Sequence, residues 1–176
     1  MFKTEEAKRF FAAWQALRKG AALPHYRQVF QDLPHEFLPQ GLILEQVYDA
    51  KNLDLYMVRF MGTRVAEYWN LDVTGNDIFA LMAPKVATAG RRNMASVLSH
   101  PCGLITVGLF SIASRDELAI ETVTVPAANE PGRPARILGF VQDLRAPFPL
   151  ADDRPDVAER QWLDIGMGVP AKKPAA

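Results

Sequence analysis

Cys102 and His100 are the residues whose types and spacing come closest to a catalytic pair. A histidine can deprotonate a thiol, and residues i and i+2 of a strand share a face, so the two could serve as nucleophile and base. Pro101 lies between them, however, and no third group that would orient the histidine is evident. A lone cysteine among apolar neighbours is usually a small core residue. The pattern does not favour catalysis, and we predict that the protein is not an enzyme.

The serines, glycines and other histidines indicate no second reaction centre. No serine has the context of a nucleophile elbow, and the glycines of "NEPGRPARILG" precede a predicted strand rather than a helix, so they form no phosphate loop. His25 and His35 lack partners at the spacing of a metal site. We therefore predict no metal ion and assign no catalytic residue.

The charge balance and the single cysteine limit the classes of partner. The 176 residues include 20 basic and 20 acidic side chains, and 49% of them are apolar. Binding to nucleic acid or to an anionic membrane surface needs a basic surface, so neither is expected. One cysteine allows no intrachain disulfide, the start of the chain does not resemble a signal peptide, and no apolar run is long enough to span a bilayer. These features predict a soluble, cytoplasmic protein without membrane insertion.

A helix is predicted over residues 5–19, because apolar side chains recur on one face at helical spacing. Thr4 can cap it and Gly20 can terminate it. A face this aromatic needs a partner surface, which is either the rest of the same chain or a second copy in a homodimer. The candidate dimer contacts are Phe10, Phe11, Trp14 and Leu17.

Two strands are predicted after a loop that contains three prolines, residues 21–40, with room for one helical turn. The strands span residues 41–49 and 53–60, and Ala50-Lys51-Asn52 forms the turn between them. Alternation places Tyr56, Val58 and Phe60 on one face of the second strand. Arg59 places a charge on the opposite face of the strand, which indicates that this aromatic face points inward.

Three helices and three strands complete the predicted order. Thr63 can cap a short helix with Tyr68 and Trp69, a second short helix near Asp77 carries Phe79 and Met82, and a longer one begins at Pro84 and ends at His100-Pro101. The strands cover residues 102–112, 117–125 and 135–143, with the turn "ASRD" between the first two. One further helix is predicted over residues 156–165, followed by a disordered end, "VPAKKPAA".

This order predicts an α+β fold: a five-stranded antiparallel sheet with short helices covering one face and an N-terminal amphipathic helix. Such an arrangement leaves a cavity between the sheet and the helical cover. The predicted boundaries are 1–40 for the N-terminal helix and loop, 41–144 for the sheet domain, and 145–176 for a partly disordered extension.

Several short motifs resemble a PAS domain family of alphaproteobacteria. An early helix and loop carry Trp14, Leu17, Arg18, Gly20 and Leu23-Pro24. An aromatic strand ends in Arg59-Phe60-Met61-Gly62-Thr63, and the Asp-x-Thr-Gly turn is Asp72-Val73-Thr74-Gly75. Glu121 with Pro126, and Ile137-Leu138-Gly139, match the last two strands, and the resemblance covers roughly residues 10–144. We thus expect the PAS fold for residues 41–144.

The resemblance implies a bacterial sensory or interaction module that stands alone, without an attached kinase. PAS domains bind small molecules between sheet and helices or pair with other proteins, so we expect a homodimer and a signalling protein partner. Flavin-binding light sensors carry a cysteine in an Asn-Cys-Arg-Phe-like stretch, and haem-binding ones a helix histidine. Cys102 follows Pro101 at a strand start, and His100 stands at a helix end before proline. The resemblance therefore does not favour flavin or haem, and no other cofactor is assigned beyond an unknown small organic ligand.

The large side chains of the predicted cavity walls are the candidate ligand contacts. They are Tyr56, Val58, Phe60, Tyr68, Trp69, Phe79, Met82 and Thr106. Two alternatives remain open. The same cavity could belong to an enzyme or carrier for a small hydrophobic compound, which an ionisable group at its centre would favour. The protein could instead be a pure interaction module whose interior is filled by side chains. The volume of the cavity distinguishes this alternative from a ligand-binding sensor.

Overall fold

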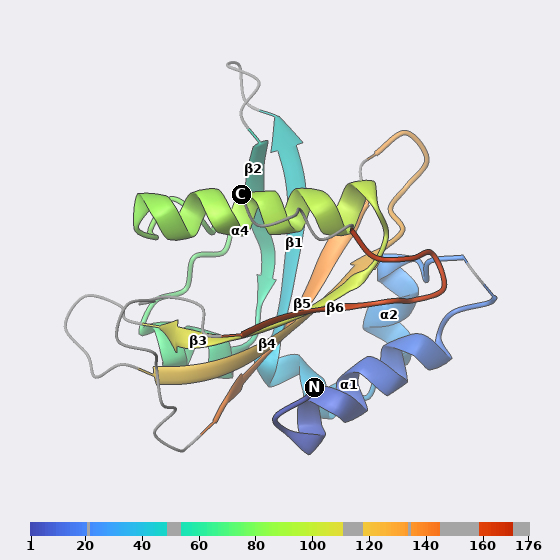
Figure 1. Ribbon diagram of the computed structural model, residues 1–176, viewed down its shortest axis with the longest axis horizontal. Helices are drawn as coiled ribbons and strands as arrows, with labels where there is room; N and C mark the ends of the chain where they lie inside the picture. The colour runs from blue at the N-terminus through green and yellow to red at the C-terminus, as the bar shows by residue number, and fades with distance from the viewer. Residues whose placement is uncertain (21, 49–53, 111–117, 134, 145–158, 171–176) are drawn as a thin grey trace.

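The computed structural model describes residues 1–20, 22–48, 54–110, 118–133, 135–144 and 159–170. Within these ranges the fold is α+β, with a six-stranded antiparallel sheet and several helices (Figure 1). The helices are α1 (Glu5–Ala16), α2 (Tyr26–Asp32), the 3-10 helix η1 (His35–Gln40), α3 (Thr63–Trp69) and α4 (Pro84–Ser99). The strands are β1 (Gly41–Tyr48), β2 (Asp54–Met61), β3 (Gly103–Phe110), β4 (Leu118–Ala127), β5 (Arg136–Asp143) and β6 (Glu159–Leu163). The predicted turns at 50–52 and 113–116 and residues 171–176 of the predicted disordered end lie outside the described residues.

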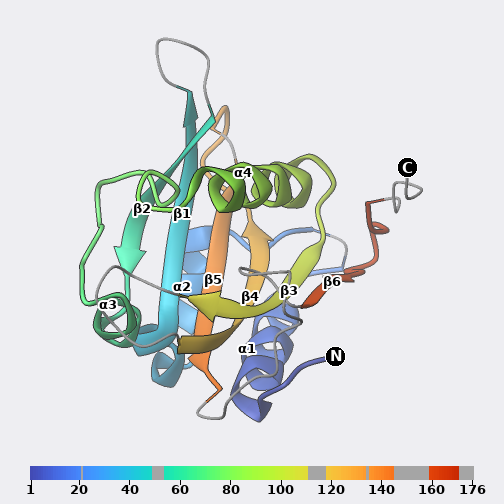
Figure 2. The same cartoon turned by 60° about the vertical axis from the view of Figure 1, so that its left-hand side comes forward.

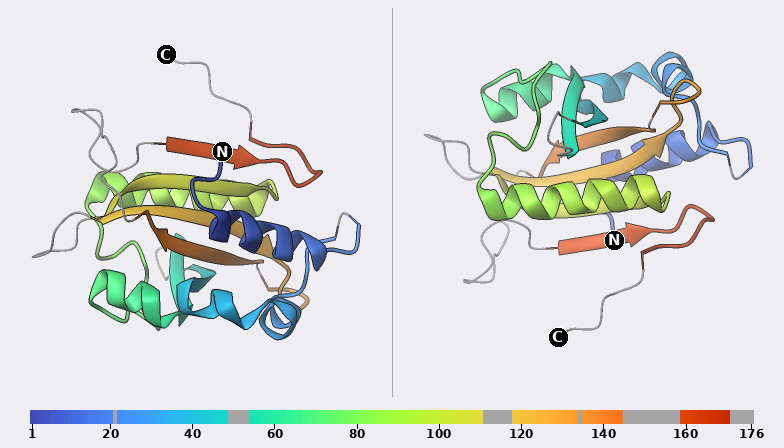
Figure 3. Two further views of the ribbon diagram at one scale, coloured as in Figure 1. Left: turned by 90° about the horizontal axis from the view of Figure 1, so that it is seen from below. Right: turned by 90° about the horizontal axis from the view of Figure 1, so that it is seen from above.

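The strand order in the sheet is β2-β1-β5-β4-β3-β6. The predicted α+β class and antiparallel sheet are confirmed, with one strand more than predicted. That strand, β6, lies within the segment 156–165 that was predicted to be helical, and pairing with β3 satisfies the backbone groups of an otherwise open edge. Figure 3 shows β6 along this edge with the N-terminus beside it, where Lys3 Nζ lies 2.8 Å from a carboxylate oxygen of Glu159.

Helices lie on both faces of the sheet (Figure 2), and one apolar cluster occupies each face. We call the face beneath α3 and α4 the inner face; its cluster includes Tyr56, Trp69 and Val97. The outer face carries α1 and α2, with Phe10, Trp14 and Phe140 among its buried side chains. Each strand therefore contributes alternate side chains to two separate cores.

The predicted N-terminal helix forms as α1, and the chain's own sheet is the surface that its apolar face contacts. Thr4 caps it by accepting a hydrogen bond from Ala7 N at 3.2 Å, as predicted. Phe10 and Trp14 are 2% and 0% exposed, and the ring of Phe10 stacks on Phe140. Of the four candidate dimer contacts, these two are thus buried inside the protomer, while Phe11 and Leu17 are partly exposed. Dimerisation itself stays a prediction.

The segment 21–40 contains more helix than predicted. His25 caps α2, its Nδ1 accepting from Arg27 N at 3.2 Å, and Pro34 leads into η1. The prolines that suggested a loop stand where helices tolerate them, at a boundary and within a 3-10 turn. Val29 and Phe37 bury this segment against the outer core.

A β-bulge in β2 moves Phe60 off the predicted face. Ile43 pairs with Phe60 but Leu44 pairs with Val58, so Arg59 is the extra residue. The prediction that Phe60 shares the inward face of Tyr56 and Val58 is therefore wrong. Phe60 contacts the outer cluster, with its ring edge-on to Phe30.

The second short helix predicted near Asp77 is a series of turns instead. Asp72 accepts hydrogen bonds from the backbone N and hydroxyl of Thr74, which fixes a turn in place of a helix start. Val58 N donates to Asn76 O at 2.9 Å, so the segment pairs with the free edge of β2. The first short helix forms as α3, but Gly62 occupies its N-cap and the Thr63 side chain forms no cap hydrogen bond. No helix of the described residues is long and apolar enough to span a bilayer.

Candidate functional site

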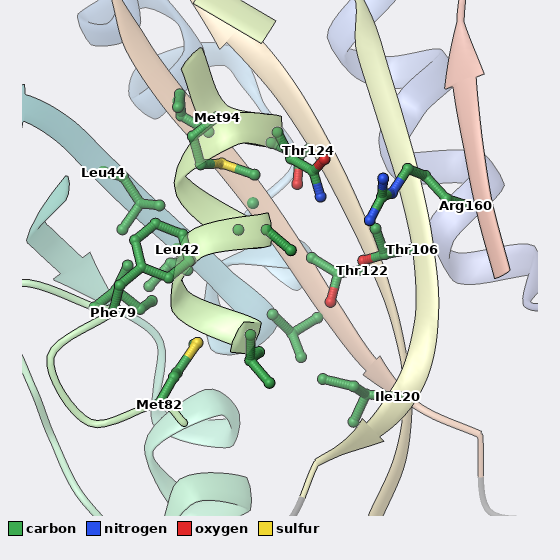
Figure 4. Close-up of a pocket in the computed structure, with 18 of the residues that line it drawn as sticks. Leu42, Leu44, Phe79, Met82, Met94, Thr106, Ile120, Thr122, Thr124 and Arg160 are labelled. Atoms are coloured by element: carbon green, nitrogen blue, oxygen red, sulfur yellow. The ribbon is translucent and has the colours of Figure 1, made fainter. Parts of the chain in front are cut away.

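A cavity of about 490 Å³ lies between the inner face of the sheet and α4 (Figure 4). Its floor consists of inward side chains of the strands, among them Leu44, Ile120 and Ile137. Its roof is α4, which contributes Ala89 and Met94. The volume lies within the range of pockets that hold small organic molecules.

Phe79 forms one wall, and Gly90 makes room for its ring. A Cβ at Gly90 would overlap the ring of Phe79, so the helix and the ring can approach this closely only because position 90 lacks a side chain. The ring also meets Tyr56 edge-on, with 5.6 Å between the ring centroids. A glycine inside a helix costs about 1 kcal/mol relative to alanine, and here it allows the wall to close under the roof.

Threonines form a polar strip across the largely apolar floor. Thr106 on β3 and Thr122 on β4 are direct register partners, and Thr124 follows on the same face of β4. All three line the cavity, and Figure 4 shows them along one side of it. Their hydroxyls can donate or accept hydrogen bonds and can therefore orient an occupant.

Asn93 brings an amide group into the cavity from the roof. The residue is 7% exposed, and among the residues that the structure describes none forms a hydrogen bond with its side chain. Buried polar side chains nearly always have a hydrogen-bond partner. The amide can both donate and accept, so a molecule in the cavity would supply what the protein does not.

Two cations, Lys85 on α4 and Arg160 on β6, are the ionisable side chains of the described cavity lining. Both residues are exposed at their positions on the cavity wall. Arg160 is the register partner of Thr106 across β3 and β6, so Thr122, Thr106 and Arg160 form one row over three neighbouring strands. The described part of the lining thus carries positive charge and no carboxylate.

Arg91 ties the roof to the sheet. Its guanidinium forms an ion pair with Asp77, donates to the carbonyl oxygen of Asp54, and lies 5.2 Å from the centroid of the Phe79 ring. Asp77 Oδ1 in turn accepts from Tyr56 N at 3.0 Å. Helix α4, the turn segment and β2 are therefore joined at one point, which holds the cavity's roof above its floor.

The eight predicted ligand contacts divide between the cavity and its surroundings, and one of them, Phe60, packs on the opposite, outer face of the sheet. Trp69, Phe79, Met82 and Thr106 line the cavity. Tyr56 and Val58 are fully buried in the inner core without lining it, and Tyr68 packs against that core from outside. The Tyr56 hydroxyl lies 3.5 Å from the carbonyl oxygen of Arg91, and burial, with nearby Asp54 and Tyr48, raises the pKa of this phenol.

Apart from Thr106, the polar residues of the cavity were not predicted from the sequence. Asn93 stands four residues from both Ala89 and Val97 in a predicted helix, and Thr122 and Thr124 alternate along a predicted strand, so their positions could have been read from periodicity. Arg160 could not, because its segment was assigned to a helix. The predicted ligand contacts were mostly large side chains, whereas the groups able to orient a ligand are small or lie outside the predicted sheet.

Cys102 and His100 do not line the cavity. Cys102 is fully buried in the inner core, where burial and the charge of Asp164 raise the pKa of its thiol to about 11. His100 is exposed and ends α4. The described residues contain no group of three or more His, Cys, Asp or Glu side chains that could hold a metal ion.

A buried carboxylate on the outer face anchors α1. Glu121 on β4 is 0% exposed, and its oxygens accept hydrogen bonds from Lys3 N at 2.7 Å, Thr4 N at 2.8 Å and Thr4 Oγ1 at 2.7 Å. The negative charge also suits the positive end of the helix dipole. Glu121 is thus adjacent in sequence to Thr122, which faces the cavity on the opposite side of the sheet.

The sequence matches the family described as PAS domain over residues 2–142, whereas no curated protein matches the chain. Similar solved structures include the LOV protein of Rhodobacter sphaeroides (12% identity, 78% of this chain, 68% of that chain, TM-score 0.45). The VqmA dimer of Vibrio cholerae is also similar (14% identity, 67% of this chain, 51% of that chain, TM-score 0.47). So is the PAS domain of an HTR-like protein of Haloarcula marismortui (13% identity, 67% of this chain, 93% of that chain, TM-score 0.41). The family match runs from before α1 into β5, and Arg160 lies beyond it.

Proposed function

The chain belongs to the PAS domain family, and from that premise we propose that it is a sensor or adaptor that binds a small organic molecule beneath α4. One observation carries the proposal: the cavity of about 490 Å³ contains the buried amide of Asn93, which has no hydrogen-bond partner among the described residues. An interior filled by its own side chains would leave no such space. A ligand would bury the apolar walls and satisfy the amide.

The chemistry of the lining supports binding rather than catalysis. The ionisable groups of the described lining are Lys85 and Arg160, and that lining holds no acidic, histidine or cysteine side chain with which they could form a catalytic pair. The high pKa of Cys102 and its burial in the core, outside the described lining, argue against an adduct between its thiol and a flavin, and the place of His100 at the end of α4 argues against an axial haem ligand. We therefore prefer a reversible ligand to an enzyme or carrier substrate.

Strand β4 offers a route from the cavity to α1. Its residues alternate between Thr122 and Thr124, which face the ligand, and Glu121, which anchors the N-terminus of α1. A ligand that prefers one position of β4 would change how firmly α1 is held. A signalling partner, or a second copy of the chain, would then recognise α1 in one of its two states.

Native mass spectrometry of the purified protein, before and after denaturation, tests the proposal by detecting a released small molecule. The Ala89→Phe variant, which adds a ring to the roof, tests the location: it should abolish retention of that molecule and binding of 1-decanol, used as an apolar probe in calorimetry. The matched control is Thr88→Phe, because Thr88 is exposed on the same helix. A folded Ala89→Phe protein that binds as well as the control would refute the cavity as the binding site.

A further inference from the structure

We propose that the ligand of this cavity is an apolar molecule with one carboxylate, and that Arg160 binds the carboxylate. This inference rests on the proposed function, since it names the chemical class of the occupant. It adds a recognition residue from β6, a strand outside the range that matches the family.

Strand register directs Arg160 toward the cavity. Because Arg160 pairs with Thr106 and Trp162 pairs with Leu104, these two β6 side chains share the inner face of the sheet. Trp162 packs against the inner core, whereas Glu159 lies on the other face with Lys3. Figure 4 shows the Arg160 side chain reaching over β3 toward Thr106 and Thr122.

The charge of Arg160 is not matched by an acid of the described chain. Several arginines of the described chain are paired, as Arg59 is with Glu45 at 2.6 Å and Arg64 with Glu67 at 3.2 Å. No ion pair joins Arg160 to an acidic side chain among the described residues, and the cavity lining holds no carboxylate. An arginine that lines a pocket without an acid is suited to a carboxylate, which its planar guanidinium can bind through two parallel hydrogen bonds.

The neighbours of Arg160 complete a site for the head group and leave the rest of the cavity apolar. Thr106 and Thr122 occupy the same row of the sheet and can donate hydroxyl hydrogens to a carboxylate beside the guanidinium. Beyond this row the walls are aliphatic and aromatic, with Leu42, Phe79 and Met94 among them. The ligand would therefore place its charge at the β3–β6 edge and its apolar body under α4.

The test compares two carboxylates with their neutral alcohols, decanoate with 1-decanol and 4-phenylbutyrate with 4-phenylbutanol, by calorimetry on the full chain. The variants are Arg160→Gln, which removes the charge, and Arg92→Gln as a matched control, since Arg92 is exposed on α4 and does not line the cavity. We expect Arg160→Gln to weaken carboxylate binding by about tenfold and to leave the alcohols unchanged. Carboxylate binding should also weaken with added salt, because the guanidinium is exposed.

The inference is overturned if the carboxylates bind no more tightly than their alcohols to the unmodified protein, or if Arg160→Gln and Arg92→Gln affect carboxylate binding equally. Binding of both alcohols without any preference for the acids would leave the proposed function standing and remove only the role of Arg160. If none of the four probes binds, the carboxylate inference fails, and the release experiment with Ala89→Phe alone decides the proposed function.

Discussion

Replacing Glu121 with glutamine should loosen α1 from the sheet while leaving the sheet folded. The carboxylate accepts three hydrogen bonds at 2.7–2.8 Å, two from backbone N–H groups of Lys3 and Thr4 and one from the Thr4 hydroxyl. Glutamine keeps the size of the side chain but has one accepting oxygen. Whichever way its amide is turned, an NH₂ group faces at least one backbone N–H donor, so at least one of these part-buried donors loses its partner.

The expected loss of stability follows from those contacts. A hydrogen bond to a charged group contributes about 1.5–3 kcal/mol, and a neutral one about 0.5–1.5 kcal/mol. Losing one such bond and weakening the others should cost about 2–3 kcal/mol in the free energy of unfolding. Glu159→Gln is the control, because its pair with Lys3 Nζ is partly exposed, with side chains 33% and 47% accessible, and should change stability by no more than about 0.5 kcal/mol.

Urea unfolding gives the global free energy, and hydrogen exchange locates the change. Amides of α1 should exchange faster in Glu121→Gln, whereas those of β1 and β5 should keep their protection if opening is local. Equal effects of Glu121→Gln and Glu159→Gln on stability and on α1 exchange would refute the anchoring role of the buried carboxylate.

Three further outcomes are expected. Asp77→Asn, which breaks the ion pair with Arg91, should lower the free energy of unfolding by about 1–3 kcal/mol in urea titrations, whereas Glu67→Gln at an exposed pair should have almost no effect. Gly90→Ala should change stability by less than about 1 kcal/mol, since improved helix propensity opposes the clash with Phe79, but should weaken 1-decanol binding measured by calorimetry as the ring moves into the cavity. Because the folded state holds the Cys102 proton up to a pKa of about 11, against 9.0 ordinarily, this thiol should not affect stability below about pH 9 and should lower it between those values. A pH titration of stability should therefore fall less steeply above pH 9 in Cys102→Ala, and equal slopes would contradict the raised pKa.

The sequence predicted the parts of the fold that local patterns specify. The Thr4 cap, the proline start of α4 and the two consecutive pairings of β3, β4 and β5 depend on residues close in the chain. The errors concern segments whose conformation depends on distant partners. The turn segment near Asp77 and the strand β6 both satisfy open sheet edges, which single-segment periodicity cannot reveal.

The bulge at Arg59 shows the same limit within one predicted strand. Alternation assigned Phe60 to the inner face, and one extra residue moved it to the outer face. For the cavity, half of the predicted contacts line it, because aromatic residues next to short helices do gather there. The face on which the threonines lie follows from alternation, but the alignment of Thr122, Thr106 and Arg160 in one row depends on strand register, which only the assembled sheet defines.

If a ligand acts through β4, the effect must also run in the opposite direction. Thr122 and Glu121 are consecutive residues on opposite faces, and β4 is hydrogen-bonded to β3 and β5 on its two sides, so only small shifts of its backbone are available. Such shifts suffice, because the hydrogen bonds at Glu121 depend steeply on distance and angle.

Linkage requires that a ligand which loosens α1 binds more tightly when α1 is already loose. Glu121→Gln should therefore change the affinity for 1-decanol, while Glu159→Gln should not, when both are measured by calorimetry. Identical affinities in both variants and in the unmodified protein would mean that α1 is a structural cover and that any signal leaves the domain by another surface.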